Sequence, residues 1–169
     1  VTEFVARAID LEPADLADVL AELDDAERLH VVQQLPAGLS GPALVEMPGE
    51  EHAEDTLAAL PAQRAAEIVD ELQDDDAADL IGELDPAAQE RILAQVEDRA
   101  GLDRLLRYDQ HTAGGLMTTH VVKVLANDTV AGALDEIRRQ SEELEDFYQI
   151  FVVDGDDSLV GSLPLKGLV

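Results

Sequence analysis

Pairs of apolar residues recur along the first part of the chain, and the two members of each pair lie three residues apart. The pairs are Leu20/Leu23, Val32/Leu35, Leu44/Met47, Leu57/Leu60, Val69/Leu72, Ile81/Leu84 and Leu93/Val96. Their leading members are 12, 12, 13, 12, 12 and 12 residues apart. A spacing of three places both members on one face of a helix, and a period of about 12 leaves two turns of helix and a short connection. The pattern predicts a repeat of short helices.

Residues that favour helix ends lie between the pairs. Four prolines follow an apolar pair within one or two residues, namely Pro36, Pro48, Pro61 and Pro86. Asp24 and Glu27 have the spacing of a capping box, and Asp85 lies at a suitable N-cap position. Because helices this short are marginal alone, we expect about eight to ten of them before Arg107 to stack as a right- or left-handed all-α superhelix.

The pattern changes after Tyr108 to strands and one helix. Segments 120–125, 147–154 and 158–165 are rich in β-branched or aromatic residues and are predicted strands. The sequence Asn127-Asp128-Thr129 favours the start of a helix over 130–140. We therefore predict a multi-domain α plus α/β fold, with an all-α repeat over residues 1–107 and an α/β domain over residues 108–169.

Charge separates the same two parts. The 169 residues include 38 acidic and 11 basic side chains, a formal net charge of -27. Residues 1–110 hold 28 acidic and 7 basic side chains, and residues 111–169 hold 10 and 4. Such a charge disfavours nucleic acid and anionic lipid and attracts cations. Adaptation to a high-salt cytoplasm is an equally good explanation of the excess, and it does not exclude particular acidic clusters as cation sites.

The sequence offers little for catalysis or for a transition-metal site. It contains no cysteine, Walker loop or G-x-S-x-G motif, so we expect no enzyme. The four histidines, His30, His52, His111 and His120, lack metal-ligand spacing. Gly114-Gly115 is interpreted as a sharp interdomain turn. No apolar run is long enough to span a membrane, so a soluble chain is expected.

Three segments of the second part resemble a cystathionine-β-synthase-type (CBS) regulatory domain. They are AGGLMTTHVVKV (113–124), TVAGALDEIR (129–138) and YQIFVVDGDDSLVGSLPLKGLV (148–169). The pattern Tyr108-Asp-x-x-x-Ala-Gly-Gly-Leu-Met-Thr, after a stack of short acidic helices, resembles the cytosolic region of MgtE-type magnesium channels. The resemblance covers essentially the whole chain. It implies a superhelical N domain followed by the first of two CBS domains (β-α-β-β-α), truncated at its C-terminus.

The resemblance also implies a function. In that family the cytosolic domains form a dimeric Mg²⁺ sensor, in which bound Mg²⁺ holds acidic faces together and closes a transmembrane pore. The chain would then lie at the cytoplasmic face of the cell membrane. Its expected partners are Mg²⁺ ions, a second copy bound through the CBS domains, and the pore domain of the same parent chain, with no nucleic acid among them.

The run QDDDAADL, residues 73–80, carries the candidate ligands. Asp75 and Asp79 are four residues apart, hence on one helical face, and Mg²⁺ prefers oxygen ligands. The family has an Asp pair of this spacing at the matching helix start, which implies ligand roles for Asp75 and Asp79 and a weaker one for Asp76. The alternative is structural, because acidic side chains at a helix start cap free amides and complement the dipole. The acids Glu50, Glu51, Glu54 and Asp55 are interpreted first as a solvated face.

A second function stays open. CBS domains that bind adenosine nucleotides often carry Gly-x-x-Ser/Thr-x-x-Asp after the last strand. Here Gly161 is followed by Pro164 and Gly167, so both polar positions are lost. A soluble CBS-containing regulator or scaffold that binds an adenosine nucleotide at another site, or a protein partner, is the alternative to the Mg²⁺ sensor.

Overall fold

The computed structural model describes residues 8–48, 53–97, 99–109, 111–119, 121–140 and 148–167. Its contacts divide the chain into two compact units, Val1–Met117 and Thr118–Val169. The domain boundary predicted between residues 107 and 108 stays a prediction. No helix in the described part of the chain is long and apolar enough to cross a membrane.

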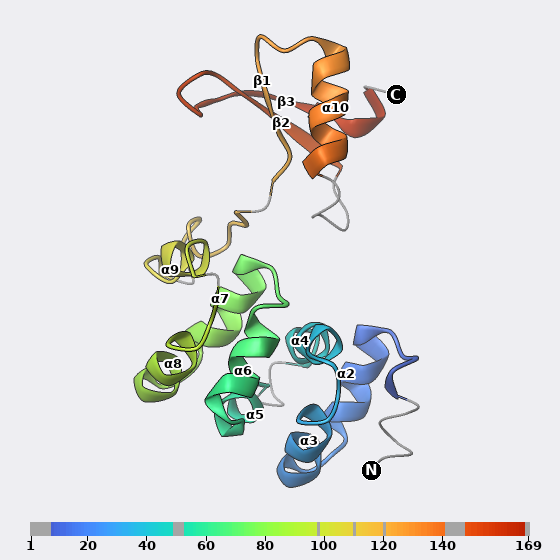
Figure 1. The fold of residues 1–169 in the computed structure, drawn as a ribbon, viewed down its shortest axis with the longest axis vertical. Coiled ribbons are helices and arrows are strands. Elements are labelled where there is room, and N and C mark those ends of the chain that lie inside the picture. The colour runs from blue at the N-terminus through green and yellow to red at the C-terminus, as the bar shows by residue number, and fades with distance from the viewer. Residues whose placement is uncertain are drawn as a thin grey trace. The chain divides into compact units, whose positions relative to one another are not determined.

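The described part of the first unit contains eight helices (Figure 1). They are α2 (Pro13–Ala21), α3 (Asp25–Val32), α4 (Ala37–Val45), α5 (Ala53–Ala59), α6 (Ala62–Val69), α7 (Asp74–Gly82), α8 (Pro86–Leu93) and α9 (Leu102–Leu105). Those from α2 to α8 have seven to nine residues each. The predicted repeat of short helices is confirmed.

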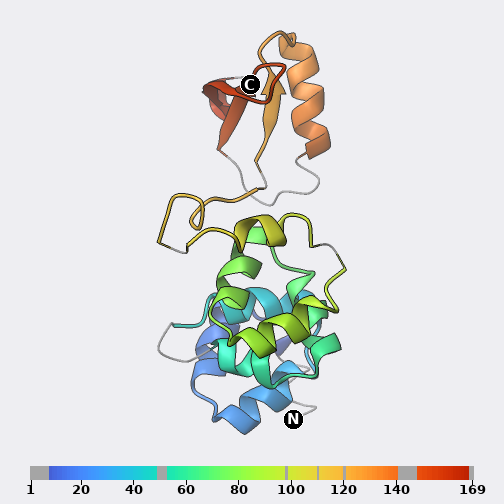
Figure 2. The same cartoon turned by 90° about the vertical axis from the view of Figure 1, so that its left-hand side faces the viewer.

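Each helix packs on the helix two positions further along the chain. One row runs α2, α4, α6 and α8, and the other runs α3, α5, α7 and α9. Figures 1 and 2 show the helices stacked in this way. The predicted apolar pairs explain the packing, because every member lies in or against one common core. The leading residue lies at or near the end of its helix, and the trailing residue lies in the turn that follows.

The residues predicted at the helix ends act as expected. Asp24 Oδ1 accepts a hydrogen bond of 2.9 Å from the Glu27 N–H. Asp85 Oδ1 accepts from the N–H groups of Ala87 and Ala88, at 2.9 and 3.1 Å. Pro86 is the first residue of α8, while Pro36 and Pro61 directly precede α4 and α6. The segment after Pro48, residues 49–52, lies outside the described residues.

Two arginines donate hydrogen bonds to backbone carbonyls at the ends of helices that come earlier in the chain. Arg64 of α6 donates to the carbonyl oxygens of Val32, at 3.3 Å, and Leu35, which end α3. Arg91 of α8 donates to the carbonyl oxygens of Ala58, at 2.6 Å, and Leu60, at 3.4 Å, at the end of α5. Each arginine thus contacts the helix three positions earlier in the chain. The last carbonyls of a helix carry partial negative charge, which a guanidinium complements.

The second unit is a three-stranded sheet with one helix. Its elements are β1 (Lys123–Leu125), α10 (Val130–Gln140), β2 (Gln149–Val153), β3 (Leu159–Pro164) and a 3₁₀ turn (Leu165–Gly167). The strand order is β1-β2-β3, with β1 parallel and β3 antiparallel to β2. Its buried core consists of Val122, Val124, Ala133, Ile137 and Ile150.

The α plus α/β class is confirmed, and helix α10 covers the residues predicted for it. The hydroxyl of Thr129 accepts a hydrogen bond of 3.1 Å from the Gly132 N–H, as the predicted cap requires. The described strands are shorter than predicted, because β1 pairs with β2 only from Lys123↔Phe151 to Leu125↔Val153, and β2 pairs with β3 only from Gln149↔Pro164 to Val153↔Leu159. His120 and Phe147, at the ends of two predicted strands, lie outside the described residues.

The bonds from Arg64 to the end of α3 predict a stability effect. We expect Arg64→Met to lower the free energy of unfolding by about 1–3 kcal/mol, because it leaves two carbonyls without their charged donor. Urea unfolding followed by circular dichroism measures this change.

The matched control is Arg104→Met, which removes the same charge from an exposed position in the same unit. A net charge of -27 makes any lost cation slightly unfavourable, so this variant isolates the general effect. Equal losses in the two variants would contradict the capping role of Arg64.

Candidate functional site

Helix α7 begins with three consecutive aspartates. Its N-cap residue is Gln73, whose side chain makes no capping hydrogen bond. Asp74, Asp75 and Asp76 occupy the first turn, and Asp79 lies on the next turn. Negative side chains at this end of a helix interact favourably with its dipole. The local sequence therefore places four carboxylates within two turns. The helix dipole stabilises the three in the first turn and offsets part of their mutual repulsion.

Asp74 has a place in the packing of the first unit. Its carboxylate lies against Gly101, the residue before α9, where an added Cβ would lie 1.6 Å from Asp74 Oδ2. A side chain at position 101 would therefore require the Asp74 carboxylate to move.

Asp75 carries an oxygen without a partner. Its Oδ1 atom is buried and has no hydrogen-bond partner, although the residue as a whole is only half-buried. Buried polar atoms are nearly always hydrogen-bonded, because an unsatisfied acceptor loses its hydration without compensation. This oxygen does not cap the helix. Its capacity to accept a hydrogen bond is therefore unused in this structure.

Asp76 and Asp79 lie in an unfavourable electrostatic environment. Burial raises the pKa of Asp76 above its usual value, and the charges of Asp75, Asp79 and Glu46 raise it further. Asp79 is exposed as a residue, but partial desolvation of its carboxylate and the charge of Asp75 likewise raise its pKa. The ionised forms of these carboxylates repel one another, so a bound cation would relieve the repulsion.

Asp79 lines two hollows of the first unit. One, of about 190 Å³, also has the carboxylates of Asp76, Glu54 and Glu83 around apolar side chains that include Leu44 and Leu80. The other, of about 250 Å³, contains Asp109 and the linker residues Tyr108 and Gly115. Neighbouring Gly114 allows a close approach of the Tyr108 ring, whose Cδ1 atom would lie 2.4 Å from an added Cβ. None of the described glycines has a positive φ, so close packing explains Gly114 better than an unusual backbone.

Sequence reasoning missed several of these carboxylates. Glu46 and Asp109 approach α7 from other elements, and the 12-residue period carries no signal for such lateral contacts. Glu83 is the C-cap residue of α7 itself, four residues after Asp79. Glu54 was interpreted as part of a solvated face, but it is half-buried and lines the smaller hollow, whereas Asp55 is exposed. Glu50, Glu51, His52 and His120 lie outside the described residues.

The acids of α7 do not form a ready-made metal cage. Across the residues that the structure describes, no three acidic or histidine side chains converge as they would around one metal ion. Mg²⁺ commonly keeps several waters and uses only one or two carboxylates, so the donor set suits this ion better than one that needs many protein ligands. The ligand roles of Asp75, Asp79 and Asp76 stay predictions.

Comparison with known proteins gives a consistent result. A sequence profile described as the MgtE intracellular N domain matches residues 11–111. The chain is 36% identical over 164 residues to the magnesium transporter MgtE of Thermus thermophilus, covering 95% of this chain and 36% of that protein. It is 37% identical over 73 residues to the magnesium transporter MgtE of Enterococcus faecalis, covering 43% of this chain and 16% of that protein.

Two solved structures are similar over nearly the whole chain. One is the soluble part of a magnesium transporter, with a TM-score of 0.83, 28% identity and coverage of 99% of this chain and 66% of that one. The other is the cytosolic domain of the Mg²⁺ channel MgtE in complex with ATP, with a TM-score of 0.84, 33% identity and coverage of 97% and 68%. The chain spans about a third of the length of the Thermus thermophilus transporter. Because the profile covers more than half of the sequence, the chain belongs to the MgtE intracellular N domain family.

Proposed function

We propose that this chain is the cytosolic Mg²⁺-sensing regulatory region of a magnesium channel or transporter. The observation that carries the proposal is the crowding of carboxylates on α7. Asp75 has an unpartnered buried oxygen, and the pKa values of Asp76 and Asp79 are raised. The names of the similar proteins, which are magnesium transporters and a Mg²⁺ channel, support magnesium as the ion.

In the proposed mechanism Mg²⁺ replaces repulsion by attraction. Asp75 and Asp79 are the principal ligands and Asp76 the weaker one, with water and a second acidic surface completing the coordination. When Mg²⁺ is abundant, the ion bridges the acidic faces and holds the pore of the parent protein closed. When Mg²⁺ falls, the like charges separate the faces and the pore opens. The chain acts by binding at the cytoplasmic face of the membrane and catalyses no reaction.

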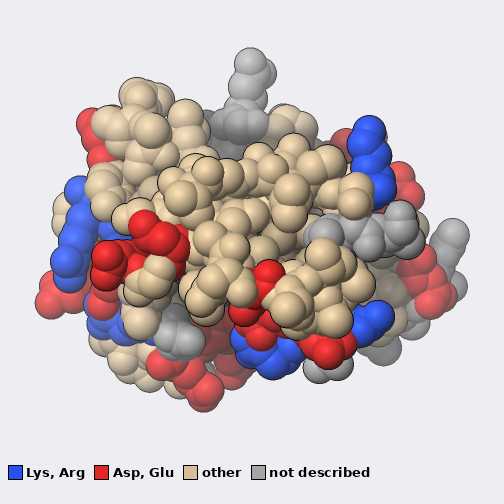
Figure 3. All heavy atoms as spheres, turned by 90° about the horizontal axis from the view of Figure 1, so that it is seen from above, with Lys and Arg blue, Asp and Glu red and all other residues tan. Residues whose placement is uncertain are grey.

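The proposal includes assembly through the second unit. We assign this unit as a partial CBS domain that forms a homodimer, a role supported by its exposed apolar side chains. Tyr148 is 78% exposed, Leu159 65% and Val160 60%. Figure 3 shows one face of the molecule on which uncharged residues predominate, with some acidic side chains among them. Large exposed apolar groups of this kind are typical of interaction surfaces.

An alternative function is a soluble CBS-containing regulator or scaffold that binds an adenosine nucleotide or a protein partner. The similar structure solved with ATP favours the nucleotide. Against it, Gly161, Pro164 and Gly167 supply neither the hydroxyl nor the carboxylate that nucleotide-binding CBS domains often use. Titration with ATP in the absence of Mg²⁺ distinguishes the two functions, because only the alternative requires the nucleotide to stabilise the fold.

The proposed site predicts a Mg²⁺-dependent stability that requires α7. With KCl high and constant, Mg²⁺ should stabilise the fold in a saturable way, by about 2.7 kcal/mol when its concentration is 100 times Kd. The Asp75→Asn/Asp79→Asn variant should show a markedly smaller gain. Thermal unfolding followed by circular dichroism over a MgCl₂ series measures both.

The control for this experiment is the Asp18→Asn/Glu90→Gln variant, which removes two exposed acids from the other helices α2 and α8. It should keep the full Mg²⁺ response. If both double variants respond equally, Mg²⁺ binds no particular site on α7 and the proposal fails.

The raised pKa values predict a pH dependence with a definite sign. A carboxyl whose pKa is higher in the folded than in the unfolded state destabilises the fold when it is ionised. That penalty is present at neutral pH, fades as the pH falls through the raised pKa, and is absent below the ordinary value of 3.8. Without Mg²⁺, Asp79→Asn should therefore be more stable than the wild type at pH 7, by about 0.2–0.5 kcal/mol for one like-charge pair four residues apart.

The difference between Asp79→Asn and the wild type should vanish at pH values near 3.8, as urea unfolding at a series of pH values would reveal. The Mg²⁺ effect on the wild type should weaken over the same range, because protons compete for Asp76 and Asp79. A variant less stable than the wild type at pH 7 would show that Asp79 makes a favourable contact instead.

A further inference from the structure

The outer edge of β1 is covered by a side chain. Strand β1 pairs only with β2 among the described strands, so its other side is a sheet edge. On the inner side, Val122 O accepts a hydrogen bond of 2.9 Å from the Phe151 N–H. Backbone groups alternate in direction along a strand, so those of Lys123 point outward. Edges with free N–H and C=O groups pair readily with other chains.

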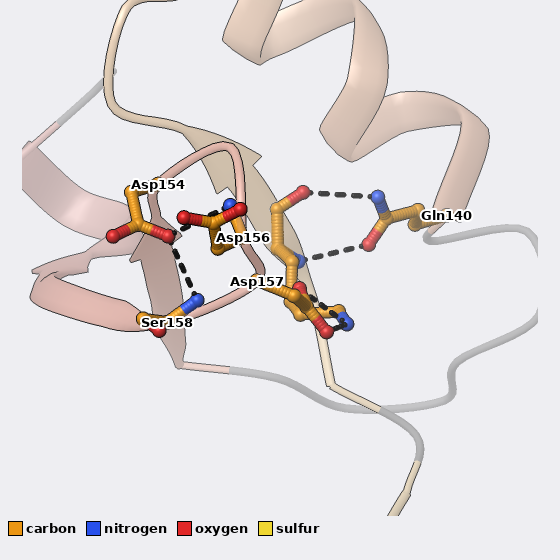
Figure 4. A network of polar contacts seen from close by, with 6 residues as sticks. Gln140, Asp154, Asp156, Asp157 and Ser158 are labelled. Atoms are coloured by element: carbon orange, nitrogen blue, oxygen red, sulfur yellow. Dashed lines mark hydrogen bonds and ion pairs between the residues drawn. The ribbon is translucent and has the colours of Figure 1, made fainter.

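Gln140 satisfies both outward groups of Lys123. The Lys123 N–H donates to Gln140 Oε1 at 3.0 Å, and Gln140 Nε2 donates to Lys123 O at 3.0 Å (Figure 4). These two bonds reproduce the pair that a residue on an adjacent antiparallel strand would make. The next outward residue is also satisfied, because Asp128 Oδ2 accepts from the Leu125 N–H at 3.1 Å, and Leu125 O accepts from the Asp128 N–H at 3.0 Å.

Neighbouring side chains hold the amide of Gln140 in place. Glu136, one turn earlier on α10, accepts a bond of 2.5 Å from Gln140 Nε2 and also pairs with Arg139. The side chain of Lys123 is fixed at the same time, because its Nζ atom lies 3.0 and 2.9 Å from the two carboxylate oxygens of Asp157. Asp157, which Figure 4 labels, has a positive φ of 59° in the turn between β2 and β3.

We propose that Gln140 closes the outer edge of β1 by occupying the place of a neighbouring strand. Without its amide, β1 pairs with β1 of a second copy of this chain. A second copy is the occupant because the edge is self-complementary in an antiparallel pair, which a twofold axis generates. The net charge of -27 opposes such pairing at low salt, so salt should reveal it.

The test uses Gln140→Met in the 169-residue chain at high KCl, because methionine keeps the length and the helix propensity of glutamine but cannot form these bonds. In dilute solution, amide hydrogen exchange measured by NMR should be at least about tenfold faster at Lys123 than in the wild type, the factor expected for about 1.4 kcal/mol of lost protection. Exchange at Phe151 should be unchanged. As the protein concentration rises, sedimentation should show more self-association than the wild type shows at the same concentration, and Lys123 should regain its protection.

The matched control is Arg138→Met, an exposed position on the same helix. It should behave as the wild type in both measurements. If Phe151 loses protection in Gln140→Met, the variant is misfolded and Gln140→Ala takes its place. Slow exchange at Lys123 in a folded variant would overturn the closure. Fast exchange with no more self-association than in the wild type, or added self-association that leaves Lys123 unprotected, would overturn pairing with a second copy.

Discussion

The structure of the first unit depends on burying two apolar residues at the end of each short helix. Helices of seven to nine residues are too short to be stable alone, so each must pack on others to persist. The members of a pair end one helix and begin its turn, and the helix two positions further along covers them. Burying one leucine side chain contributes about 1.5–3 kcal/mol, whereas a like-charge pair on a helix costs about 0.2–0.5 kcal/mol. The apolar pairs therefore outweigh many local repulsions, and the fold tolerates its acidic surface.

The few basic side chains of the first unit stabilise its helix stack and do little to neutralise its acidic surface. Arg64 and Arg91 bind backbone carbonyls at the ends of α3 and α5, and Arg28 is only 4% exposed. Arg28 is buried and Arg64 half-buried, whereas Arg91 is exposed, but all three guanidinium groups donate to backbone carbonyls of the stack. They contribute correspondingly little to neutralising distant carboxylates. The acids of α7 are left with burial and with one another, which is why the pKa values of Asp76 and Asp79 are raised.

The sequence was sufficient for features that depend on local spacing. The apolar pairs, the caps at Asp24 and Asp85, and the helix over 130–140 all follow from residues close together in the chain. It was insufficient where segments meet sideways. Glu54 of α5 joins Asp79 around one hollow, Asp109 joins Asp79 around another, and Gln140 reaches Lys123 across 17 positions. The pattern also placed Asp75 on a helix start without revealing that one of its oxygens is buried and unpartnered, since that depends on the packing around α7.

The cluster of carboxylates on α7 does not supply a full set of metal ligands. This suits the proposed sensor better than a complete cage would. A preformed cage would bind Mg²⁺ in any arrangement of the parent protein, and binding would then report nothing about that arrangement. In the described residues no three ligands converge, so tight binding requires oxygen atoms from a second surface. Binding and association are then thermodynamically linked, and the linkage is reciprocal: the surface that improves Mg²⁺ binding is itself held more tightly when Mg²⁺ is bound. Repulsion among Asp75, Asp76 and Asp79 supplies the opposite force when the ion leaves, so one group of residues accounts for both states.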